Sequence, residues 1–583
     1  MKALLSGNEA IARGAYENGV TVATAYPGTP STEILENMVN YKDKIYCEWS
    51  PNEKVAMEVA VGASFGGART LVAMKHVGLN VAADPFLTLS YTGVKGGMVV
   101  VSADDPSMHS SQNEQDNRHY ARLAKVPMLE PSDSQEAKDF VGIALDISEQ
   151  FDTPVLLRTT TRISHSKTVV ELKDRREKPE PAEFERAPQK FVMIPGHARL
   201  RHIEVEERLK RLEEYANNAE INRIEWGDAK IGVITSGISY QYVKEAMPEA
   251  SVLKLGMTYP LAKDLIRSFA EKVDTLFIVE ELDPFLEEQI KAMGIKVTGK
   301  DKLPLIYEFD QGVIRERLLG EKRKEDNILS DVSLPPRPPV LCPGCPHRGV
   351  FYVLKKLKLV VTGDIGCYTL GVVPPLSAMD TTVCMGASVG MAFGVELALK
   401  DKVKHKVVGV IGDSTFVHSG ITGLIDIVYN KGASTVIILD NRITGMTGHQ
   451  DNPATGKTLM GEHTHQLDLG EVARAVGVKS VRVIDPYDLG ETERVIREEI
   501  AKDEPSVIIT NRPCVLIVKD KEWDKYQVDQ ELCRSCGMCY KVGCSAIYKE
   551  NGKAKIDILF CTGCGICGQV CRFNAIKKVG EEE

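Results

Sequence analysis

Short apolar runs alternate with glycine-rich turns and helical patterns over the first part of the chain, to about residue 165. The runs at 21–26, 70–74 and 97–101 are rich in Val, Ala and Thr and carry few charged or polar residues. Strands without polar alternation are typical of a parallel sheet that helices cover on both faces. We therefore predict a doubly wound α/β domain over residues 1–165.

Two later segments repeat this pattern and predict further α/β domains. These domains span residues 229–330 and 341–515, with their clearest apolar runs at 231–235, 275–279, 407–411 and 435–439. Together with the first segment, they predict an α/β protein made of several doubly wound parallel-sheet domains.

The stretches between and after these domains differ in composition. Residues 166–228 are rich in Glu, Lys and Arg with few strand signals, which favours a solvated helical linker. The proline-rich residues 334–339 predict a stiff boundary. Residues 523–583 are rich in Cys and Gly, and we expect a small α+β domain of a different kind there.

Composition and charge exclude several classes of protein. At 583 residues the chain is too long for a single core. A net charge of −9 argues against nucleic-acid binding, which needs clustered Lys and Arg. No run approaches about 18 consecutive apolar residues, and the apolar run at the N-terminus is too short for a secretory signal. We therefore expect no membrane span and a cytoplasmic protein.

Eight of the 14 cysteines fall between Cys533 and Cys571. They form two runs, each with three cysteines in a CxxCxxC pattern and a fourth a few residues later. Such a triplet wraps one [4Fe–4S] cluster, whereas the fourth cysteine of the run ligates the other cluster. We therefore assign one cluster to Cys533, Cys536, Cys539 and Cys571, and the second to Cys561, Cys564, Cys567 and Cys544.

Zinc is the alternative for this tail, because CxxC pairs also make tetrahedral zinc sites. Zinc has no need of the third cysteine in each triplet, so we favour iron–sulfur clusters. The tail resembles the bacterial two-cluster ferredoxins, with two departures. Four residues, not three, separate Cys539 from Cys544, and neither Cys544 nor Cys571 is followed by proline.

Polar residues follow the apolar runs at 407–411 and 435–439. If these runs are parallel strands, their carboxyl ends are where open α/β sheets bind ligands. A carboxylate, an amide oxygen and a backbone carbonyl could hold Mg²⁺ and clamp a diphosphate there; ordinary strand-end turns are the alternative. The segments resemble the thiamine diphosphate motif, with Ser414 in place of a glycine and Asp440 in place of an asparagine. That resemblance implies a cofactor site made by Gly412, Asp413, Ser414, Asn441 and the Ile443 carbonyl.

The whole chain resembles the alpha subunits of indolepyruvate:ferredoxin oxidoreductases, which belong to the 2-oxoacid:ferredoxin oxidoreductase superfamily. The resemblance covers the Tyr-Pro-Gly-Thr-Pro-Ser segment at 26–31, the middle α/β segment, the Cys-Pro-Gly-Cys turn at 342–345, the diphosphate motif and the tail. It implies the domain order pyrimidine-binding (1–165), transketolase-C-like (229–330), diphosphate-binding (341–515) and ferredoxin-like (523–583).

In that family a glutamate of the pyrimidine-binding domain hydrogen-bonds N1′ of thiamine diphosphate. The resemblance implies Glu53 for this role, with Glu48 and Glu58 as rivals and a surface salt bridge as the alternative for all three. It also implies that Thr29 lies at the cofactor and the substrate. In the stretch 109–118, Arg118 is the natural cation for a substrate carboxylate, or else a surface arginine.

Family members hold a further cluster near the thiazolium ring. The matching positions are Cys342, Cys345, Cys367 and Cys514, and four matches in order favour a third [4Fe–4S] cluster here. A metal-free turn is the alternative, because His347 and Arg348 follow where small residues are more usual. The remaining Cys47 and Cys384 are expected to be buried core thiols.

The resemblance implies that a 2-oxoacid, an aryl pyruvate of the indolepyruvate class, is oxidatively decarboxylated with coenzyme A. Electrons would pass through the clusters to ferredoxin, which basic residues of the tail could dock. These residues are Arg534, Lys541, Arg572, Lys577 and Lys578. The resemblance also implies a smaller beta subunit in a hetero-oligomer, and it leaves open whether the thiamine site forms within or between chains.

Three alternatives remain at this point. The same chemistry could act on pyruvate or a branched-chain 2-oxoacid, since nothing in the sequence sizes the substrate pocket. A non-catalytic electron-transfer subunit would have no need of Glu53, Asp413 and Asn441 together. A non-oxidative decarboxylase would have no use for clusters.

Overall fold

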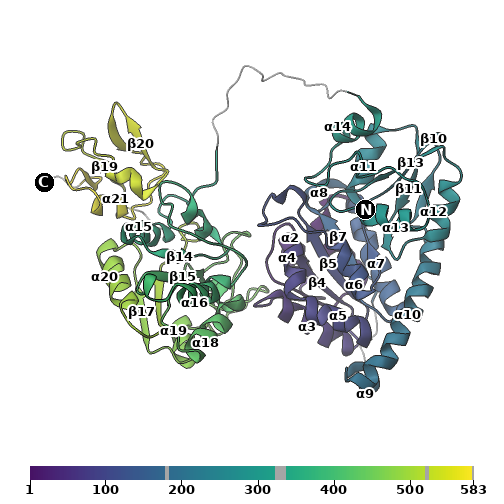
Figure 1. Ribbon diagram of the computed structural model, residues 1–583, viewed down its shortest axis with the longest axis horizontal. Helices are drawn as coiled ribbons and strands as arrows, with labels where there is room; N and C mark the ends of the chain where they lie inside the picture. Colours follow the sequence, from purple (N-terminus) through teal and green to yellow (C-terminus); the bar gives the residue numbers. More distant parts are fainter. Residues whose placement is uncertain (178–182, 322–336, 519–523, 581–583) are drawn as a thin grey trace. The chain divides into compact units, whose positions relative to one another are not determined.

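The computed structural model describes residues 1–177, 183–321, 337–518 and 524–580. The chain forms two compact units, Met1–Ser330 and Asp331–Glu583 (Figure 1). The expected proline-rich boundary at 334–339 begins outside the described residues. No helix in the described part of the chain is long and apolar enough to cross a membrane.

The first unit is built around a seven-stranded sheet with the order β12-β6-β7-β5-β4-β2-β3. Neighbouring strands are parallel, except that β12 runs antiparallel to β6. Every residue of β5 is buried, which agrees with helices on both faces of the sheet. The strands are β2 (Val22–Ala25), β3 (Tyr46–Trp49), β4 (Thr70–Lys75), β5 (Met98–Asp104), β6 (Met128–Leu129), β7 (Val155–Thr160) and β12 (Met257–Tyr259).

Helices pack on this sheet and on one another. α1 packs against α7, α3 against β2 and β4, and α7 against β5 and β7. The helices are α1 (Gly7–Glu17), α2 (Thr32–Met38), α3 (Glu53–Phe65), α4 (His76–Val81), α5 (Ala83–Thr92), α6 (Arg118–Ala124), α7 (Ser134–Phe151) and α8 (Thr161–His165).

A second, four-stranded sheet of the first unit has the order β13-β10-β11-β9. β10 pairs in parallel with β11 and β13, whereas β9 is antiparallel to β11. Its elements are β9 (Arg223–Glu225), β10 (Asp228–Ser236), α11 (Gly237–Ala246), β11 (Ala250–Leu255), α12 (Lys263–Ala270), β13 (Thr275–Val279), α13 (Phe285–Ala292) and α14 (Gln311–Ile314).

The two sheets share one hydrophobic core. Val72 and Val100 of the first sheet belong to the same buried cluster as Ile234, Leu253 and Ile278 of the second. The segments that we expected as separate domains therefore fold as parts of one compact unit.

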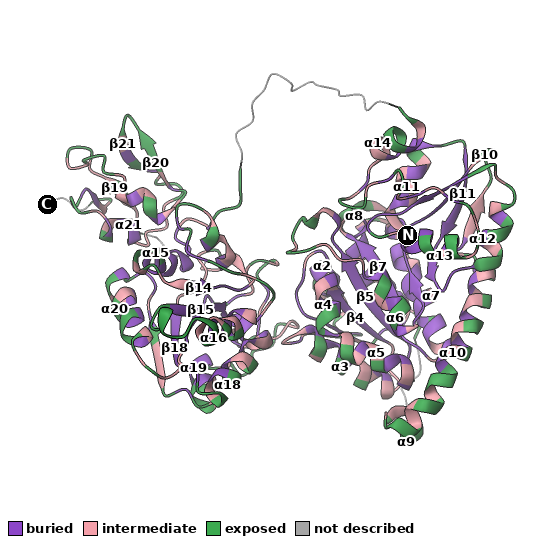
Figure 2. Ribbon diagram, viewed as in Figure 1, coloured by how far each residue is buried: buried purple, intermediate pink, exposed green. Residues whose placement is uncertain are grey.

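The segment 166–228, expected as a solvated linker, is instead packed into the first unit. β8 (Lys167–Glu171) pairs with β1 (Lys2–Ser6), and α10 (Pro195–Asn218) buries a narrow stripe of side chains. The stripe contains Val205, Arg208, Leu212 and Ala216, which recur at helical spacing, while the other residues of α10 are half-buried or exposed (Figure 2). The short helix α9 (Pro188–Phe191) precedes it. A helix with so few apolar residues reads as solvated in sequence, although its one apolar face is buried.

Arg118, expected as a ligand for the substrate, is instead an internal tie between the two sheets of the first unit. Its side chain is 1% exposed. Its guanidinium donates to Asp116 at 2.8 Å and 2.5 Å, to Glu280 at 2.5 Å, and to the backbone oxygens of Glu281 and Asp283 at 2.9 Å each. These bonds engage Nε and both terminal nitrogens, so the group is committed to the fold and is not available to a substrate carboxylate.

The second unit contains a five-stranded parallel sheet with the order β14-β15-β16-β18-β17. All residues of β15 and β16 are buried. The strands are β14 (Val360–Thr362), β15 (Val407–Gly412), β16 (Thr435–Asp440), β17 (Ser480–Ile484) and β18 (Ser506–Asn511). The helices are α15 (His347–Leu357), α16 (Ala387–Leu399), α17 (Asp413–Thr415), α18 (Ile421–Tyr429), α19 (Leu469–Ala475) and α20 (Leu489–Ile500).

The cysteine-rich tail ends the second unit. It consists of two antiparallel strand pairs and a short helix, in agreement with the small α+β domain expected there. Its elements are β19 (Tyr526–Val528), β20 (Ile547–Glu550), β21 (Lys553–Ile556), α21 (Ile566–Gln569) and β22 (Ile576–Lys578). The expected combination of parallel-sheet α/β domains with a small tail is confirmed.

Replacing Arg118 by methionine is expected to lower the free energy of unfolding of the first unit by about 3–5 kcal/mol. The reason is that Asp116 and Glu280 would be left buried without their cation. Urea unfolding of the full chain, followed by the fluorescence of Trp49 and Trp226 of the first unit, measures the change.

The matched control is Arg162→Met, because Arg162 also joins the two parts of the first unit. Its Nε donates to Glu308 at 2.7 Å, but its side chain is 51% exposed. Loss of this solvated pair is expected to cost only about 0.2–1 kcal/mol. Equal effects of the two substitutions would contradict the structural role given to Arg118.

Candidate cofactor and cluster sites

The diphosphate motif lies at the carboxyl ends of two adjacent parallel strands of the second unit. Asp413 directly follows β15, and Asn441 directly follows β16, which pairs with β15. At Gly412, a side chain would come within 2.6 Å of the ring of Tyr368, so a glycine is required at this close approach. Regular strand pairing thus brings the two polar residues to one edge of the sheet.

Asp413 is buried, and one of its carboxylate oxygens has no partner. The residue is 3% exposed, and its Oδ1 accepts the N–H of Ser414 at 2.7 Å. Its Oδ2 makes no hydrogen bond with any described residue. Burial, and next the charge of Asp440, raises the pKa of Asp413 to about 8. A carboxylate in this position is unfavourable unless a cation or donor reaches it, so the site fits a bound Mg²⁺.

Asn441 and Ile443 complete an oxygen-rich set at the same edge. Both are buried, and Asn441 Oδ1 accepts the N–H of Ile443 at 3.3 Å. The hydroxyl of Thr444 donates to that of Ser414 at 3.1 Å and joins the two loops. Carboxylate, amide and backbone carbonyl oxygens are the ligands that Mg²⁺ prefers. The residues present therefore fit a magnesium diphosphate.

The four cysteines expected to hold a third cluster also lie together in the second unit. The N–H of Cys345 donates to the backbone oxygen of Cys342 at 3.0 Å in a tight turn. Burial, with a contribution from the charges of neighbouring thiols, raises the pKa of Cys345 to about 12 and that of Cys367 to about 11. These neighbours are Cys367 and Cys342 for Cys345, and Cys514 and Cys342 for Cys367. Thiols that oppose one another's ionisation in this way suit a metal, which binds thiolates.

This cysteine group borders the diphosphate motif. The N–H of Cys514 donates to the backbone oxygen of Asn441 at 2.9 Å. A side chain at Gly445, two residues after Ile443, would lie 3.3 Å from the sulfur of Cys367. The candidate diphosphate site and the candidate cluster site therefore share one edge of one sheet.

The eight cysteines of the tail form two groups, and each group combines cysteines from both runs. The thiols whose charges act on Cys539 are Cys536, Cys533 and Cys571; those that act on Cys567 are Cys564, Cys544 and Cys561. Each group of four lines a pocket of its own. We call the group with Cys571 the outer cluster site and the group with Cys544 the inner cluster site.

Sulfur spacing distinguishes an iron–sulfur site from a zinc site. Tetrahedral zinc holds its sulfur ligands about 3.8 Å apart, closer than a cubane cluster does. Among the described residues, Asp116, His119 and Asp283 are the only group of three or more His, Cys, Asp or Glu whose ligand atoms all lie within 4.8 Å of one another. The cysteine groups are wider than that, which favours clusters. Asp116 itself is bound to Arg118, so the acidic group is part of the ion-pair network described above.

The two cysteines left over differ from each other. Cys47 is 1% exposed, as expected for a core thiol. Cys384 is exposed, so the expectation that it would be buried is wrong. Cys384 lies in a loop just before α16. Apolar residues are near it in the sequence, but its own side chain does not pack into the core.

Glu53, the candidate partner of the pyrimidine ring, is the most buried of the three candidate glutamates. The side chain of Asn52 accepts the N–H of Val55 at 2.9 Å and caps α3, so Glu53 is fixed in the first turn. Glu53 is 4% exposed, and its Oε1 lies 2.7 Å from where a side chain at Gly78 would be. Glu58, in contrast, pairs with Lys54 in solvent.

Glu48 is a weaker candidate than Glu53, because its carboxylate is already engaged. It accepts hydrogen bonds from the hydroxyls of Tyr46 at 3.0 Å and Ser50 at 2.6 Å. The structure thus favours Glu53 by burial and by position.

Thr29 lies beside Ser110 of the candidate stretch 109–118, and Ser110 in turn contacts Lys75, which the sequence pattern did not single out. The peptide bond between Thr29 and Pro30 is cis, and the hydroxyl of Ser110 donates to the backbone oxygen of Thr29 at 3.4 Å. Lys75 donates to the backbone oxygen of Ser110 at 3.1 Å, and burial lowers its pKa. The adjacent His76 is fully buried, and burial lowers its pKa to about 4. Lys75 and His76 could have been noticed in the sequence, because they directly follow the predicted strand at 70–74.

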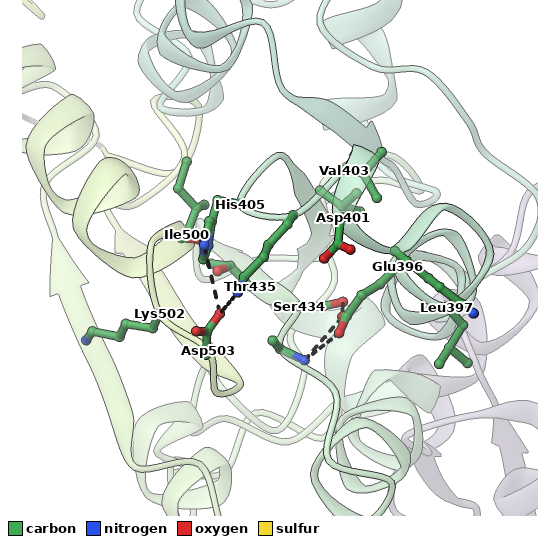
Figure 3. A pocket seen from close by; sticks show the side chains of 14 residues that line it. Glu396, Leu397, Asp401, Val403, His405, Ser434, Thr435, Ile500, Lys502 and Asp503 are labelled. Carbon is green, nitrogen blue, oxygen red and sulfur yellow. Dashed lines mark hydrogen bonds and ion pairs between the residues drawn. The ribbon is translucent and has the colours of Figure 1, made fainter.

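A cavity of about 350 Å³ in the second unit lies away from the diphosphate motif (Figure 3). It opens near the first residues of β15 and β16, at the opposite end of these strands from Asp413. Its polar groups pair with one another: Glu396 accepts the N–H of Ala433 at 2.9 Å, and Lys404 lies 2.9 Å from Asp503. None of the residues singled out from the sequence lines it.

Three family profiles match separate parts of the chain. The thiamine diphosphate-binding part of pyruvate flavodoxin/ferredoxin oxidoreductases matches residues 13–222. The C-terminal binding domain of thiamine pyrophosphate enzymes matches residues 364–510, which include the diphosphate motif. The 4Fe-4S binding domain matches residues 554–577. Two of the matches thus cover Glu53 and Asp413, and the third covers part of the tail.

Curated relatives match over nearly the full chain. Indolepyruvate oxidoreductase subunit IorA of Pyrococcus horikoshii is 43% identical over 100% of this chain and 98% of its own. The subunit of the same name from Archaeoglobus fulgidus is 43% identical, with 99% and 97% covered. A solved 2-oxoglutarate:ferredoxin oxidoreductase from Magnetococcus marinus aligns at a TM-score of 0.46 with 15% identity, over 55% of this chain and 65% of its own. The relatives that match along the whole chain show that it belongs to the family of indolepyruvate oxidoreductase subunit IorA, among the thiamine-diphosphate-dependent 2-oxoacid:ferredoxin oxidoreductases.

Proposed function

We propose that this chain oxidatively decarboxylates an aryl pyruvate of the indolepyruvate class with coenzyme A. One 2-oxoacid anion and one thiol give an acyl thioester, CO₂, a proton and two electrons, which ferredoxin accepts. The observation that carries the proposal is the shared edge of two sites, where Cys514 donates to Asn441 at 2.9 Å beside the unpartnered Oδ2 of Asp413. A redox cluster next to a diphosphate site is what this reaction requires.

The residues of each site take defined roles in this proposal. Asp413, Asn441 and the Ile443 carbonyl hold Mg²⁺, and Gly412 and Ser414 border the diphosphate. Glu53 hydrogen-bonds N1′ of the aminopyrimidine and keeps a proton at that nitrogen. When bound, thiamine diphosphate would supply a nucleophilic carbon for the ketone and an electron sink for decarboxylation.

Electrons leave through the cysteine sites of the second unit in a fixed order. Cys342, Cys345, Cys367 and Cys514 hold the cluster nearest the diphosphate site. Next is the inner cluster site, whose pocket is lined partly by Gly344 of the 342–345 turn. The outer cluster site comes last; Cys536 and the neighbouring Arg534 are exposed there, which suits docking of an acidic ferredoxin.

The choice of substrate rests on the relatives, which are named for indolepyruvate. Thr29 remains a candidate for contact with the substrate; Ser110 donates to its backbone oxygen, and Lys75 donates to the backbone oxygen of Ser110. These relatives are also named as subunits, and we propose that a smaller beta subunit completes a hetero-oligomer.

An anaerobic assay of the complex with its partner subunit, coenzyme A and ferredoxin tests the proposal. Wild-type protein is expected to turn over indolepyruvate faster than pyruvate or a branched-chain 2-oxoacid. Asp413→Asn is expected to bind thiamine diphosphate about 100-fold more weakly in the presence of Mg²⁺, because the only buried carboxylate ligand is lost. Cofactor content after gel filtration and the rate of ferredoxin reduction measure both effects.

Asp426→Asn is the matched control, because Asp426 is an exposed aspartate on α18 of the same unit. It should leave cofactor content and turnover unchanged. Full cofactor binding by the Asp413→Asn protein would refute the diphosphate site, and preference for pyruvate would refute the aryl specificity.

Glu53→Gln is expected to lower turnover by about 100-fold or more while thiamine diphosphate stays bound. An amide cannot keep the proton at N1′, so hydrogen–deuterium exchange at C2 of the bound cofactor should slow to a similar extent. This exchange, followed by NMR after acid quench, separates a loss of activation from a loss of binding. Glu58→Gln, at the solvent-exposed rival, should leave the exchange rate at the wild-type level; the reverse result would exchange the two assignments.

Cys367→Ser is expected to remove about four iron atoms per chain from about 12 in the wild type, because each [4Fe–4S] cluster contributes four. Iron analysis and EPR of the dithionite-reduced protein provide the measurement. Cys384→Ser is the control at an exposed thiol outside the three groups. An unchanged iron content in the Cys367→Ser protein would reduce the proposal to the two clusters of the tail.

A further inference from the structure

Arg348 is a buried cation that pairs with no carboxylate in the described part of the chain. The residue is 1% exposed and begins α15 together with His347. Its Nη2 donates to the backbone oxygens of Leu341 at 2.7 Å and Cys342 at 2.9 Å. Its Nη1 donates to those of Val542 at 3.1 Å and Gly543. All four acceptors are uncharged carbonyl oxygens.

No carboxylate of a described residue pairs with this guanidinium, and its Nε has no hydrogen-bond partner among those residues. A buried charge without a counter-charge is strongly unfavourable. The position adds to the cost, because the first turn of a helix carries the positive end of the helix dipole. Arg118, which is equally buried, is neutralised by Asp116 and Glu280. Anions beside Arg348 would lower this cost.

Two groups of cysteines supply such anions on either side of Arg348. The charge of Arg348 acts on Cys345 of the 342–345 turn and on Cys564 of the inner cluster site; burial raises the pKa of both thiols, and Arg348 opposes that rise. Arg348 also lines the pocket of the inner cluster site. Its bonds to Cys342 and to Gly543, next to Cys544, fix it between the two sites.

We propose that Arg348 is the shared counter-charge of two [4Fe–4S] clusters, the one at Cys342, Cys345, Cys367 and Cys514 and the one at the inner cluster site. This rests on the proposed function, which places clusters there. Each cluster gains one negative charge when it takes up one electron, and the guanidinium stays protonated in both states. A fixed cation in a buried, weakly polarisable environment favours the reduced form of both clusters. Arg348 is thus a positioning residue that sets their reduction potentials.

The test compares Arg348→Met, which keeps much of the volume and removes the charge, with Arg348→Lys, which keeps the charge. The full chain with its partner subunit is titrated anaerobically with dithionite, and the clusters are followed by EPR. In the Arg348→Met protein, two of the three cluster signals are expected to shift to more negative potentials. The signal of the outer cluster site should not move, and Arg348→Lys should stay close to the wild type.

Arg208→Met is the matched control for the loss of a buried arginine. Arg208 is 2% exposed and also donates to backbone oxygens, those of Asp152 at 2.8 Å and Ser90 at 2.6 Å, but it belongs to the first unit, whereas the cysteine groups belong to the second. Its removal is expected to lower stability and to leave all the potentials unchanged.

The outcomes separate a role of charge from a role of shape. Unchanged potentials in Arg348→Met, or equal shifts in Arg348→Met and Arg348→Lys, would overturn the proposal. If Arg348→Met loses iron while Arg348→Lys and Arg208→Met keep it, the proposal is supported, because the clusters then need the charge to assemble. Loss of iron from Arg348→Lys as well would overturn the proposal, because it would show that the hydrogen bonds of the guanidinium matter and its charge does not. Absence of iron from the wild type would remove the proposed function itself.

Discussion

Compensation of buried charge is the constraint on which the rest of this structure depends. Among the described residues, Oδ2 of the buried Asp413 has no hydrogen-bond partner, and the buried Arg348 donates to backbone carbonyl oxygens and pairs with no carboxylate. Neutralisation by a bound ion or cluster would lower the cost of burying such groups. The first points to a cation at the diphosphate motif, and the second to anionic clusters in the cysteine groups. The two requirements meet in the second unit.

Arg118 and Arg158 of the first unit differ from Arg348, because carboxylates of the chain itself pair with them. Arg158 donates to Asp104 at 2.8 Å and to Glu130 at 2.7 Å, and Arg118 binds Asp116 and Glu280. These ion pairs help to hold the first unit together, although Nη2 of Arg158 and Oδ1 of Asp104 have no hydrogen-bond partner among the described residues. Their carboxylate partners mark these two arginines as structural.

The sequence predicted those features that depend on local patterns. The apolar runs at 70–74 and 435–439 became strands β4 and β16, because uninterrupted apolar residues fit a sheet that is covered on both faces. Cysteine spacing predicted which thiols of the tail come together, since a triplet wraps one site and the fourth cysteine crosses to the other. In both cases the information lies within a few residues.

What could not be predicted depends on contacts between distant residues. Arg118 bonds Glu280, which lies 162 positions away, and no local pattern distinguishes it from an arginine that binds a substrate. The stripe of α10 around Val205 and Leu212 is too narrow to stand out among its charges. Lys75 gains interest only when Ser110, which contacts Thr29, is folded against it. Such features arise from packing.

The guanidinium fork of Arg348 has one more consequence, for the modularity of the tail. It clamps the main chain at 341–342 and at 542–543 with the same planar group, and Gly344 fits so closely against Thr562 that a side chain there would overlap it. The tail is therefore not an appendage that can be cut away to leave an intact catalytic core. Under the proposed function, loss of the cluster at the inner cluster site would loosen the turn that carries Cys342 and Cys345, so damage there spreads back toward the diphosphate site.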